Sequence, residues 1–266
     1  MPELPEVETI ARVLRPQLTG RVILSARVFW DRTLAGISPD TFCDCVANQT
    51  VCGVTRRAKY LDLQLTDFHL FIHLRMSGDL LIREAGYQPE KHDRLEIILS
   101  DDQRLIFNDP RKFGRVWLTT DAEQVLGGLG PEPFDPVFTP QLLYEMLSDR
   151  HRQIKPLLLD QGFLAGLGNI YTDEALHMAG LHPLRISDTI SEKEAELLHT
   201  AIRAVLTAGI EHNGASFDWV YRGGAFQNYF RVYAREGQPC PTCGALICKI
   251  SVGQRGTHYC PNCQKG

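Results

Sequence analysis

Two pairs of cysteines near the C-terminus constrain the fold of this chain more than any other feature. Each pair encloses two residues, and sixteen residues separate the pairs, which are Cys240–Cys243 and Cys260–Cys263. This spacing, in a chain that opens without an export signal, favours four thiolates around one zinc ion. Four sulfur ligands complete a tetrahedral shell, so the zinc would be structural and the segment a β zinc ribbon. Paired disulfides, or replacement of one cysteine by His258, are the alternatives.

The stretch between the cysteine pairs predicts a hairpin. Gly253–His258 is typical of a hairpin turn, with Arg255 near its tip. A guanidinium held there by a rigid ribbon could grip a phosphate with two parallel donors. A solvated surface arginine is the alternative.

Charge and length limit the class of protein. The chain has 266 residues, enough for about two domains, and a net charge of −4, which argues mildly against a general nucleic-acid binder. From Arg222 to Gly266, however, the chain contains six Lys or Arg residues and only one acid, which would allow a cationic surface. No apolar run of about 18 residues occurs. We therefore expect no membrane segment and a cytosolic location.

Hydrophobic periodicity predicts an N-terminal helix followed by a β domain. Apolar residues recur at helical spacing over Pro5–Leu18, and Gly20 ends the pattern. Eight short alternating runs between Val22 and Leu118, separated by turn residues, are typical of a sandwich or barrel. Three cysteines of this region are expected to be buried apolar residues of β structure: Cys43, Cys45 and Cys52.

The second half of the chain reads as helical. Leu129–Pro136 contains three prolines and predicts a stiff hinge. Helices are expected after Thr139-Pro140 and after the capping box that begins at Ser191. Between them we expect a helix over Pro156–Leu164, a glycine-rich turn over Gly166–Asn169 and a helix over Thr172–Ala179. The fold class is α+β multidomain, divided into residues 1–130, a linker 131–137, a helical domain 138–234 and a ribbon 235–266.

The N-terminus offers a nucleophile. Removal of Met1 would leave Pro2 with a secondary amine, and an α-amino group titrates near pH ~7.7–8.0, so much of it is free base at neutral pH. Attack of this amine on C1′ of a sugar gives an iminium, an electron sink. Such chemistry needs a proton donor and acceptor, and Glu3 and Glu6 are close in sequence. The alternative is an ordinary helix start, with proline in the first turn and acids near the dipole.

Two further stretches suggest contacts with DNA. In Asn108–Gly114, Arg111 and Phe113 would share a side of an extended segment, as a wedge that invades a duplex requires. Exposed N–H groups and the amide of Asn169 in the glycine-rich turn would suit a phosphate. The alternatives are a core phenylalanine and an ordinary turn. Three residues are weaker candidates, each with a core or surface alternative: Lys59, Met76 and His92.

Taken together, these motifs resemble the formamidopyrimidine-DNA glycosylase family of base-excision repair. The resemblance follows the chain in order over nearly its whole length. It is carried by Pro2–Thr9, Arg57–Tyr60, His73–Gly78, Asn108–Gly114, Leu158–Gln161, Gly166–Tyr171 and the four ribbon cysteines.

The resemblance implies an architecture and residue roles. It implies an N-terminal β-sandwich, a helix–two-turn–helix domain and a zinc ribbon, with damaged double-stranded DNA in a cleft between the domains. Pro2 would be the Schiff-base nucleophile, and Glu3 the general acid/base supported by Glu6. The other implied roles are phosphate contacts near the lesion (Lys59, which also belongs to the catalytic group, Asn169 and Arg255), void-filling side chains (Met76, Arg111, which would read cytosine, and Phe113), and DNA contacts at Lys155 and His92.

The implied activity is excision of 8-oxoguanine and formamidopyrimidines, followed by β,δ-elimination. The protein would act as a monomer in the bacterial cytosol or nucleoid, with one structural zinc. One region departs from the family pattern, because the loop over Gly214–Tyr229, which includes Trp219 and Arg222, is short. An oxidised-pyrimidine glycosylase of the endonuclease VIII type therefore stays open, as does a zinc-ribbon lesion-binding protein without catalysis.

Overall fold

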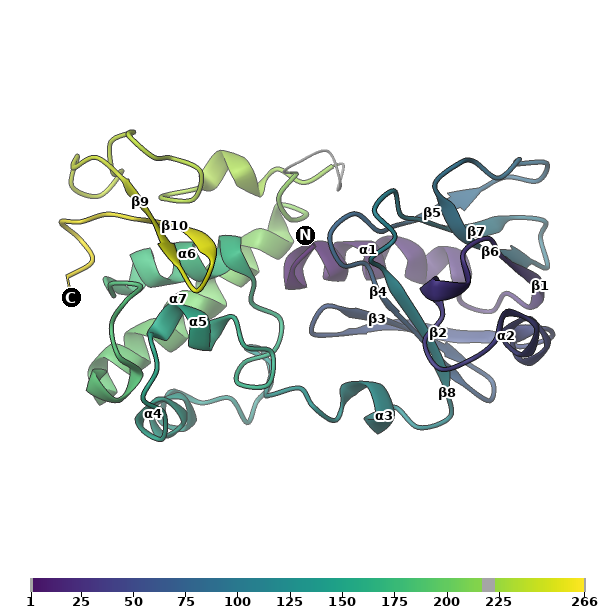
Figure 1. Ribbon diagram of the computed structural model, residues 1–266, viewed down its shortest axis with the longest axis horizontal. Helices are drawn as coiled ribbons and strands as arrows, with labels where there is room; N and C mark the ends of the chain where they lie inside the picture. Colours follow the sequence, from purple (N-terminus) through teal and green to yellow (C-terminus); the bar gives the residue numbers. More distant parts are fainter. Residues whose placement is uncertain (1, 217–222, 266) are drawn as a thin grey trace. The chain divides into compact units, whose positions relative to one another are not determined.

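The computed structural model describes residues 2–216 and 223–265, which form two compact units (Figure 1). Unit 1 comprises residues 2–127 together with Ser216 and Gly223, and unit 2 comprises residues 128–215 and 224–265. Each unit has its own core. No helix in these described ranges has the length and apolar character needed to span a membrane.

Helix α1 (Leu4–Leu18) opens unit 1 and confirms the predicted N-terminal helix. Its start is fixed locally, because the backbone N–H of Glu3 donates to the carboxylate of Glu6 at 2.7 Å. Its apolar face is buried, and the Arg15 guanidinium donates to the carbonyl of Val54 at 2.8 Å. The helix is thereby fixed against strand β2 (Val51–Arg57).

Two four-stranded antiparallel sheets form most of the rest of unit 1. The first has the order β1-β6-β7-β5, with bounds Ile23–Val28, Asp93–Leu99, Arg104–Asn108 and Asp79–Arg83. The second has the order β2-β3-β4-β8, with bounds Val51–Arg57, Tyr60–Leu65, His69–His73 and Arg115–Thr119. One apolar cluster takes side chains from both sheets and from α1, among them Leu14, Leu63, Ile72, Ile97 and Leu105. This confirms the predicted β-sandwich.

The prediction for the three N-terminal cysteines is wrong. Ser38 caps a helix, α2 (Pro39–Val46), through a bond from the Thr41 N–H at 3.2 Å, and Cys43 and Cys45 lie on this helix, half-buried. Cys52 lies on β2 but is exposed. A serine before a proline is a helix-start signal, and it outweighs the alternation of these short apolar residues. Two short helical segments complete unit 1: η1 (Asp31–Thr33) and α3 (Glu123–Leu126).

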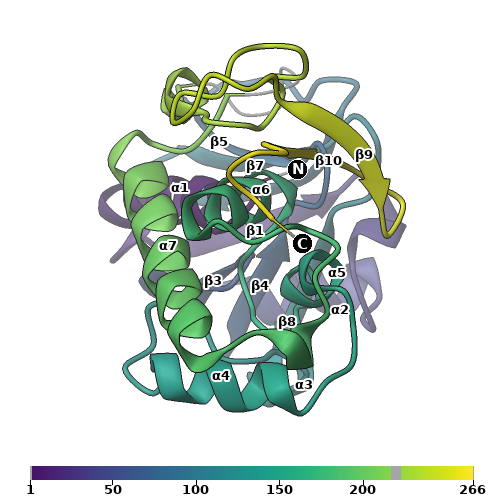
Figure 2. The ribbon, with the colours of Figure 1, turned by 90° about the vertical axis from the view of Figure 1, so that its left-hand side faces the viewer.

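Unit 2 is built from helices and one hairpin. In Figure 2, α7 (Glu192–Glu211) lies at the left of unit 2 and α4 (Pro140–Ser148) at the bottom, with α6 (Asn169–Ala179) near the centre and the β9–β10 hairpin (residues 248–259) at the upper right. Thr139 caps α4 and Ser191 caps α7, as predicted. The elements are α4 (Pro140–Ser148), α5 (Ile154–Leu158), α6 (Asn169–Ala179), η2 (Ser187–Thr189), α7 (Glu192–Glu211), η3 (Phe226–Tyr229), β9 (Cys248–Val252) and β10 (Arg255–Tyr259).

Two helix predictions in unit 2 need correction. In place of the expected helix Pro156–Leu164, the chain forms α5, which begins at Ile154 and ends at Leu158. It ends early because the Asp160 carboxylate accepts the N–H of Gly162 at 3.1 Å and draws the chain into a turn. Helix α6 begins at Asn169, three residues before the expected start. Asn169 therefore occupies the first turn of a helix, where backbone N–H groups are free of helical partners.

The proline-rich segment is fastened to unit 2. Gly130 donates its N–H to the carbonyl of Gln161 at 2.9 Å, and Ala165 donates to the carbonyl of Pro131 at 2.9 Å. The Arg203 guanidinium donates to the carbonyl of Pro133 at 2.7 Å. The division between the units falls just before this segment, at Gly127. The four-part division of the chain stays a prediction.

Candidate active site and zinc centre

Two carboxylates are buried at the N-terminus of α1. Pro2 is buried, and Glu3 and Glu6 are only 3% and 2% exposed. Carboxyl groups are seldom so buried without a specific role in structure or chemistry. The bond from the Glu3 N–H to the Glu6 carboxylate fixes the backbone beside Pro2. The geometry thus combines a potential amine nucleophile with an acid that directly follows it.

The turn that carries Lys59 is braced from α1. Ala58 has φ +52°, a left-handed conformation, and its carbonyl accepts a bond from the Arg56 guanidinium at 3.1 Å. Arg56 also donates to the Glu8 carboxylate at 3.0 Å. Burial opposes the ionised form of Glu8, but bonds from Arg56 and Arg12 outweigh it and lower the pKa of Glu8. Lys59, 5% exposed, is therefore set in a tight turn tied to the helix that carries Pro2.

His73 lies at the end of β4, which pairs with β3, the strand that follows Lys59, and its imidazole is neutral. Burial, with the nearby charges of Arg75 and Lys59, lowers the pKa of His73 to about 3. Its Nδ1 accepts the backbone N–H of Arg75 at 3.0 Å, and its ring meets Tyr60 edge to face, with centroids 4.7 Å apart. The imidazole therefore adds no charge near Lys59 at neutral pH.

This buried histidine predicts a pH-dependent stability. The unfolded value is ~6.5, so the unfolded chain binds more protons between pH 6.5 and 3, and stability falls as the pH drops through this window. Replacing His73 by Asn keeps an acceptor for Arg75 but removes the titration. Between pH 3 and 6.5, the free energy of unfolding measured with denaturant should then rise less steeply with pH in His73→Asn than in the wild type. The slope should be smaller by up to about 1.4 kcal/mol per pH unit. The difference between the two proteins should stay constant above pH 7.5, and equal slopes below pH 6.5 would refute the assignment.

Arg111 and Phe113 lie together on an exposed turn. The segment is not extended, since Lys112 has φ +60°, yet the Arg111 guanidinium lies over the Phe113 ring, 5.0 Å from its centroid. Phe113 is 49% exposed and Met76 is 38% exposed. The alternative in which these two side chains belong to the core is wrong. An exposed cation over an exposed ring is suited to stacking against bases.

Phe107 joins the Met76 loop to the Arg111 turn. A Cβ on Gly114 would lie 2.3 Å from the Phe107 ring, and a Cβ on Gly78 would lie 2.8 Å from it and 2.5 Å from the Leu74 carbonyl. Both positions therefore require glycine, because backbone and ring leave no space for a side chain. The two loops are packed onto one ring.

His92 is half-buried, not a free surface histidine. Its Nδ1 lies 3.4 Å from the Arg94 guanidinium, and its carbonyl accepts the N–H of Asp109 at 2.9 Å. Its backbone thus also adjoins the Arg111 turn.

The candidate DNA contacts of unit 2 meet at one carbonyl of the hairpin. Lys155, fully buried, donates to Asp173 at 2.6 Å and to the Gly256 carbonyl at 3.2 Å. The Asn169 amide donates to the same carbonyl at 3.0 Å. Arg255, next in the chain to Gly256, is exposed. Lys155 and Asn169 therefore hold the hairpin at the residue beside Arg255.

Two buried acids of α6, Asp173 and Glu174, anchor the backbone of unit 2 and are not predicted by the sequence. Asp173 accepts the N–H of His258 at 2.9 Å as well as the Lys155 ammonium. Burial raises the pKa of Glu174, which accepts three successive backbone N–H groups, those of Arg231, Val232 and Tyr233, at 2.9, 3.0 and 2.8 Å. The available signal was two adjacent acids in a helix that holds no other Asp, Glu, Lys or Arg residue.

The four ribbon cysteines fit a zinc ion. Their sulfur atoms all lie within 4.8 Å of one another, with Cys240–Cys263 at 3.9 Å and Cys243–Cys260 at 3.4 Å. A tetrahedron with Zn–S bonds of ~2.3 Å has S–S edges of about 3.8 Å. These separations exceed a disulfide bond, which is ~2.05 Å.

Neighbouring histidines support this centre without joining it. His258 turns its Nδ1 toward Asp173 at 3.5 Å, so its replacement of a cysteine ligand is wrong. The buried His177 has its Nε2 3.4 Å from the Cys240 sulfur, where it can act as an outer partner of that thiolate. The hairpin β9–β10, with Arg255 in register opposite Val252, confirms the predicted ribbon.

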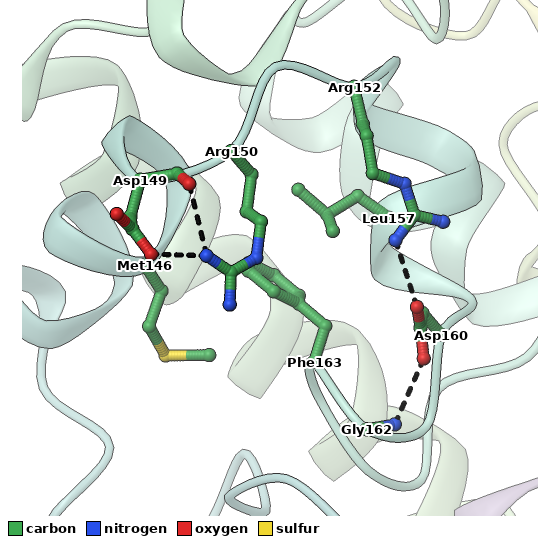
Figure 3. A pocket seen from close by; sticks show the side chains of 8 residues that line it. All are labelled: Met146, Asp149, Arg150, Arg152, Leu157, Asp160, Gly162 and Phe163. Carbon is green, nitrogen blue, oxygen red and sulfur yellow. Dashed lines mark hydrogen bonds and ion pairs between the residues drawn. The ribbon is translucent and has the colours of Figure 1, made fainter.

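A separate pocket of about 300 Å³ in unit 2 contains none of these residues (Figure 3). Its charged walls are internally paired. Arg152 donates to Asp160 at 2.9 Å, and Arg150 pairs with Asp149. The bond from Arg152 lowers the pKa of Asp160. Paired charges leave little unmatched potential for a ligand, so the pocket is not the candidate site.

Models of known protein families match most of the chain. The family described as the formamidopyrimidine-DNA glycosylase N-terminal domain matches residues 1–116, and the H2TH domain of the same enzyme matches residues 129–219. The zinc finger found in FPG and IleRS matches residues 237–266.

Individual relatives agree in length. The chain is 46% identical to a formamidopyrimidine-DNA glycosylase of a Roseiflexus species over 274 residues, covering all of both chains. It is 43% identical to one from Pelotomaculum thermopropionicum, covering 100% of this chain and 99% of the relative. Among solved structures, Lactococcus lactis Fpg with abasic-site DNA matches with a TM-score of 0.92 at 38% identity over the full length of both. MutM with DNA containing carbocyclic 8-oxo-G matches with a TM-score of 0.93 at 38% identity, again over both full chains.

Proposed function

Because this chain belongs to the formamidopyrimidine-DNA glycosylase family, we propose that it excises oxidised purines from duplex DNA and then cleaves the strand as an AP lyase. The observation that carries this proposal is the pair of buried carboxylates, Glu3 and Glu6, beside Pro2. Relatives bound to Fapy-dG and to carbocyclic 8-oxo-G support the purine preference.

The chemistry follows from the groups present. With Met1 removed, the Pro2 nitrogen attacks C1′, the glycosidic bond breaks, and the base leaves with a proton delivered through Glu3. The C1′–O4′ bond then breaks and O4′ takes a proton, which opens the sugar ring and leaves an iminium between Pro2 and C1′. This iminium acidifies C2′, so loss of the C2′ proton expels the 3′ phosphate, and a second elimination with loss of the C4′ proton expels the 5′ phosphate. Hydrolysis of the imine frees Pro2. The zinc ion supplies structure only, since four thiolates would fill its coordination shell.

The remaining site residues bind and position DNA in this proposal. Phe113, Met76 and Arg111 fill the gap left by the extruded base, with Arg111 pairing to the estranged cytosine. Lys59, Asn169 and Arg255 contact phosphates. His92 and Lys155 complete the contacts, Lys155 by holding the carbonyl of Gly256 beside Arg255.

The cellular setting is part of the same proposal. The relatives compared are bacterial, and we infer a monomer acting on damaged DNA in the bacterial cytosol or nucleoid. The short loop that leaves base preference open is only partly described, because Trp219 and Arg222 lie outside the described residues. The endonuclease VIII alternative is therefore tested by comparing activity on oxidised purines and oxidised pyrimidines, not by the geometry of this loop.

The decisive experiment is borohydride trapping. The Met1-free protein is incubated with duplexes carrying 8-oxoguanine opposite cytosine, reduced, and mapped by peptide sequencing. We expect an adduct on Pro2. A protein that binds the duplex but neither cleaves nor traps it would instead support the non-catalytic lesion binder, and faster trapping on oxidised pyrimidines would support the endonuclease VIII type.

Replacing Arg111 by Ala should relax discrimination by the opposite base. A good bidentate contact to a base edge contributes about 1–3 kcal/mol, so the preference for cytosine over adenine should fall about 5- to 150-fold. The measurement is the ratio of kcat/KM on the two duplexes. Arg21, which pairs with Asp101 at 2.5 Å on the surface of unit 1, is the control, and its Ala variant should keep the ratio. An unchanged ratio in Arg111→Ala would remove the base-reading role.

A further inference from the structure

Asp109 lies where three loops of unit 1 meet. We define the contact loops as residues 74–78, 90–92 and 109–114, which carry Met76, His92 and the Arg111–Phe113 pair. Asp109 is 1% exposed, so its carboxylate is removed from solvent, although Met76, Arg111 and Phe113 on these loops are exposed. A buried carboxylate needs several donors to offset the loss of hydration.

The Asp109 side chain receives those donors from two contact loops. Ser77 donates its hydroxyl to Oδ1, in a short contact. The N–H of Arg111 lies 3.2 Å from Oδ1 and also 3.2 Å from the Ser77 hydroxyl oxygen. The N–H of Gly114 donates to Oδ2 at 2.7 Å. One carboxylate therefore fixes both ends of the Arg111 turn and fastens it to the Met76 loop.

The Asp109 backbone reaches the third contact loop. Its N–H donates to the carbonyl of His92 at 2.9 Å. Its own carbonyl accepts the Arg94 guanidinium at 2.8 Å, and Arg94 in turn donates to the carbonyl of Lys91 at 3.0 Å. The loop with His92 is thus held to the same residue from two directions.

We propose that Asp109 is a positioning residue that holds Met76, His92, Arg111 and Phe113 as one preformed surface for the void in the duplex. This inference rests on the proposed function. Its energetic reason is preorganisation: loops ordered before binding do not lose that conformational freedom in the complex. The packing of Gly78 and Gly114 on the Phe107 ring holds two of these loops in the same arrangement.

A carboxylate is required here, and an amide is not equivalent. Asn has the same shape but only one acceptor oxygen. In Asp109→Asn the NH₂ group must face either the N–H of Gly114 or the donors at Ser77 and Arg111. One side of the turn would then lose its bond and meet a like donor, so the turn is released.

The test compares abasic sites in duplex and single-stranded DNA. A single strand has no estranged base and no gap to fill, so its cleavage reports Pro2 chemistry without the contact loops. Asp109→Asn should lower the duplex rate about tenfold more than the single-strand rate, the effect of one lost bond to a charged group. The preference for cytosine opposite 8-oxoguanine should fall with it.

Asp62→Asn is the matched control. Asp62 is also a buried acid of unit 1, 7% exposed, and its carboxylate contacts the His69 ring at 3.0 Å, away from the contact loops. This variant should lower thermal stability but slow both substrates equally. If Asp109→Asn does not fold, Ser77→Ala, which keeps the carboxylate, should show the same selective loss to a smaller extent.

The outcomes separate the two proposals. Equal slowing of duplex and single strand in Asp109→Asn or Ser77→Ala, as in the control, would overturn the positioning role while the wild-type protein stays active. A wild-type protein that cleaves neither substrate would overturn the proposed function itself.

Discussion

Replacing Glu3 by Gln is expected to lower the rate of base excision about 10²–10⁴-fold, the range that a positioned general acid–base group contributes. Glutamine keeps the size of the side chain but cannot deliver a proton to the departing base. The Pro2 amine is unaltered, so addition to a preformed abasic aldehyde, where no base has to leave, should fall much less. The measurement is single-turnover excision of 8-oxoguanine beside borohydride trapping on abasic duplex.

A matched variant guards against a change in net charge. Glu123 lies on α3, the four-residue helix of unit 1, none of whose residues is buried, and Glu123→Gln should leave both rates unchanged. Equal loss of excision and trapping in Glu3→Gln would mean that the carboxylate maintains the N-terminal structure and does not move a proton. Melting temperatures of the three proteins distinguish these cases.

Removing zinc is expected to weaken DNA binding at least about 100-fold while unit 1 stays folded, the effect of losing two or three contacts to charged groups. The ribbon has almost no core of its own. Its buried apolar cluster consists of Val232, Cys240, Ile247 and Cys260, and two of these are metal ligands. In such small domains metal binding supplies the folding free energy, about 10–16 kcal/mol in zinc-finger peptides.

The measurement is fluorescence anisotropy with abasic duplex at one fixed salt concentration, before and after mild chelation of the full chain. Hydrogen exchange over β3 and β4 reports whether unit 1 is intact. Cys248→Ser is the control, because Cys248 begins β9 but is not in the ligand cluster, and it should bind normally. Undiminished binding by the zinc-free chain would exclude the hairpin from DNA recognition.

Local patterns predicted the elements whose cause is local. The N-terminal helix follows from apolar spacing and from the Glu3–Glu6 arrangement, and the ribbon follows from cysteine spacing. The helix at Pro39–Val46 was missed because its two half-buried cysteines alternate like strand residues, while the cap at Ser38 that decides the conformation is one residue.

Buried polar residues were not predictable in the same way. Asp173 can be buried because it accepts the N–H of His258, 85 residues away in the chain. Lys155 can be buried because its ammonium pairs with the Asp173 carboxylate. The Asp109-Pro110 dipeptide is typical of an ordinary turn, yet the partner of Asp109, Ser77, lies 32 residues away in the chain. Such burial is determined by tertiary partners, which neither composition nor periodicity records.

The adjacent acids of α6 also bear on how this protein could be re-engineered. Asp173 holds the hairpin strand β10, and Glu174 holds the backbone of residues 231–233, just ahead of the ribbon. A ribbon transplanted from a relative would bring its zinc ligands but not these two anchors on the recipient helix. Chimeras should therefore carry the Asp-Glu dipeptide together with the ribbon. Where related proteins have exchanged ribbons, the dipeptide and the ribbon should be inherited together.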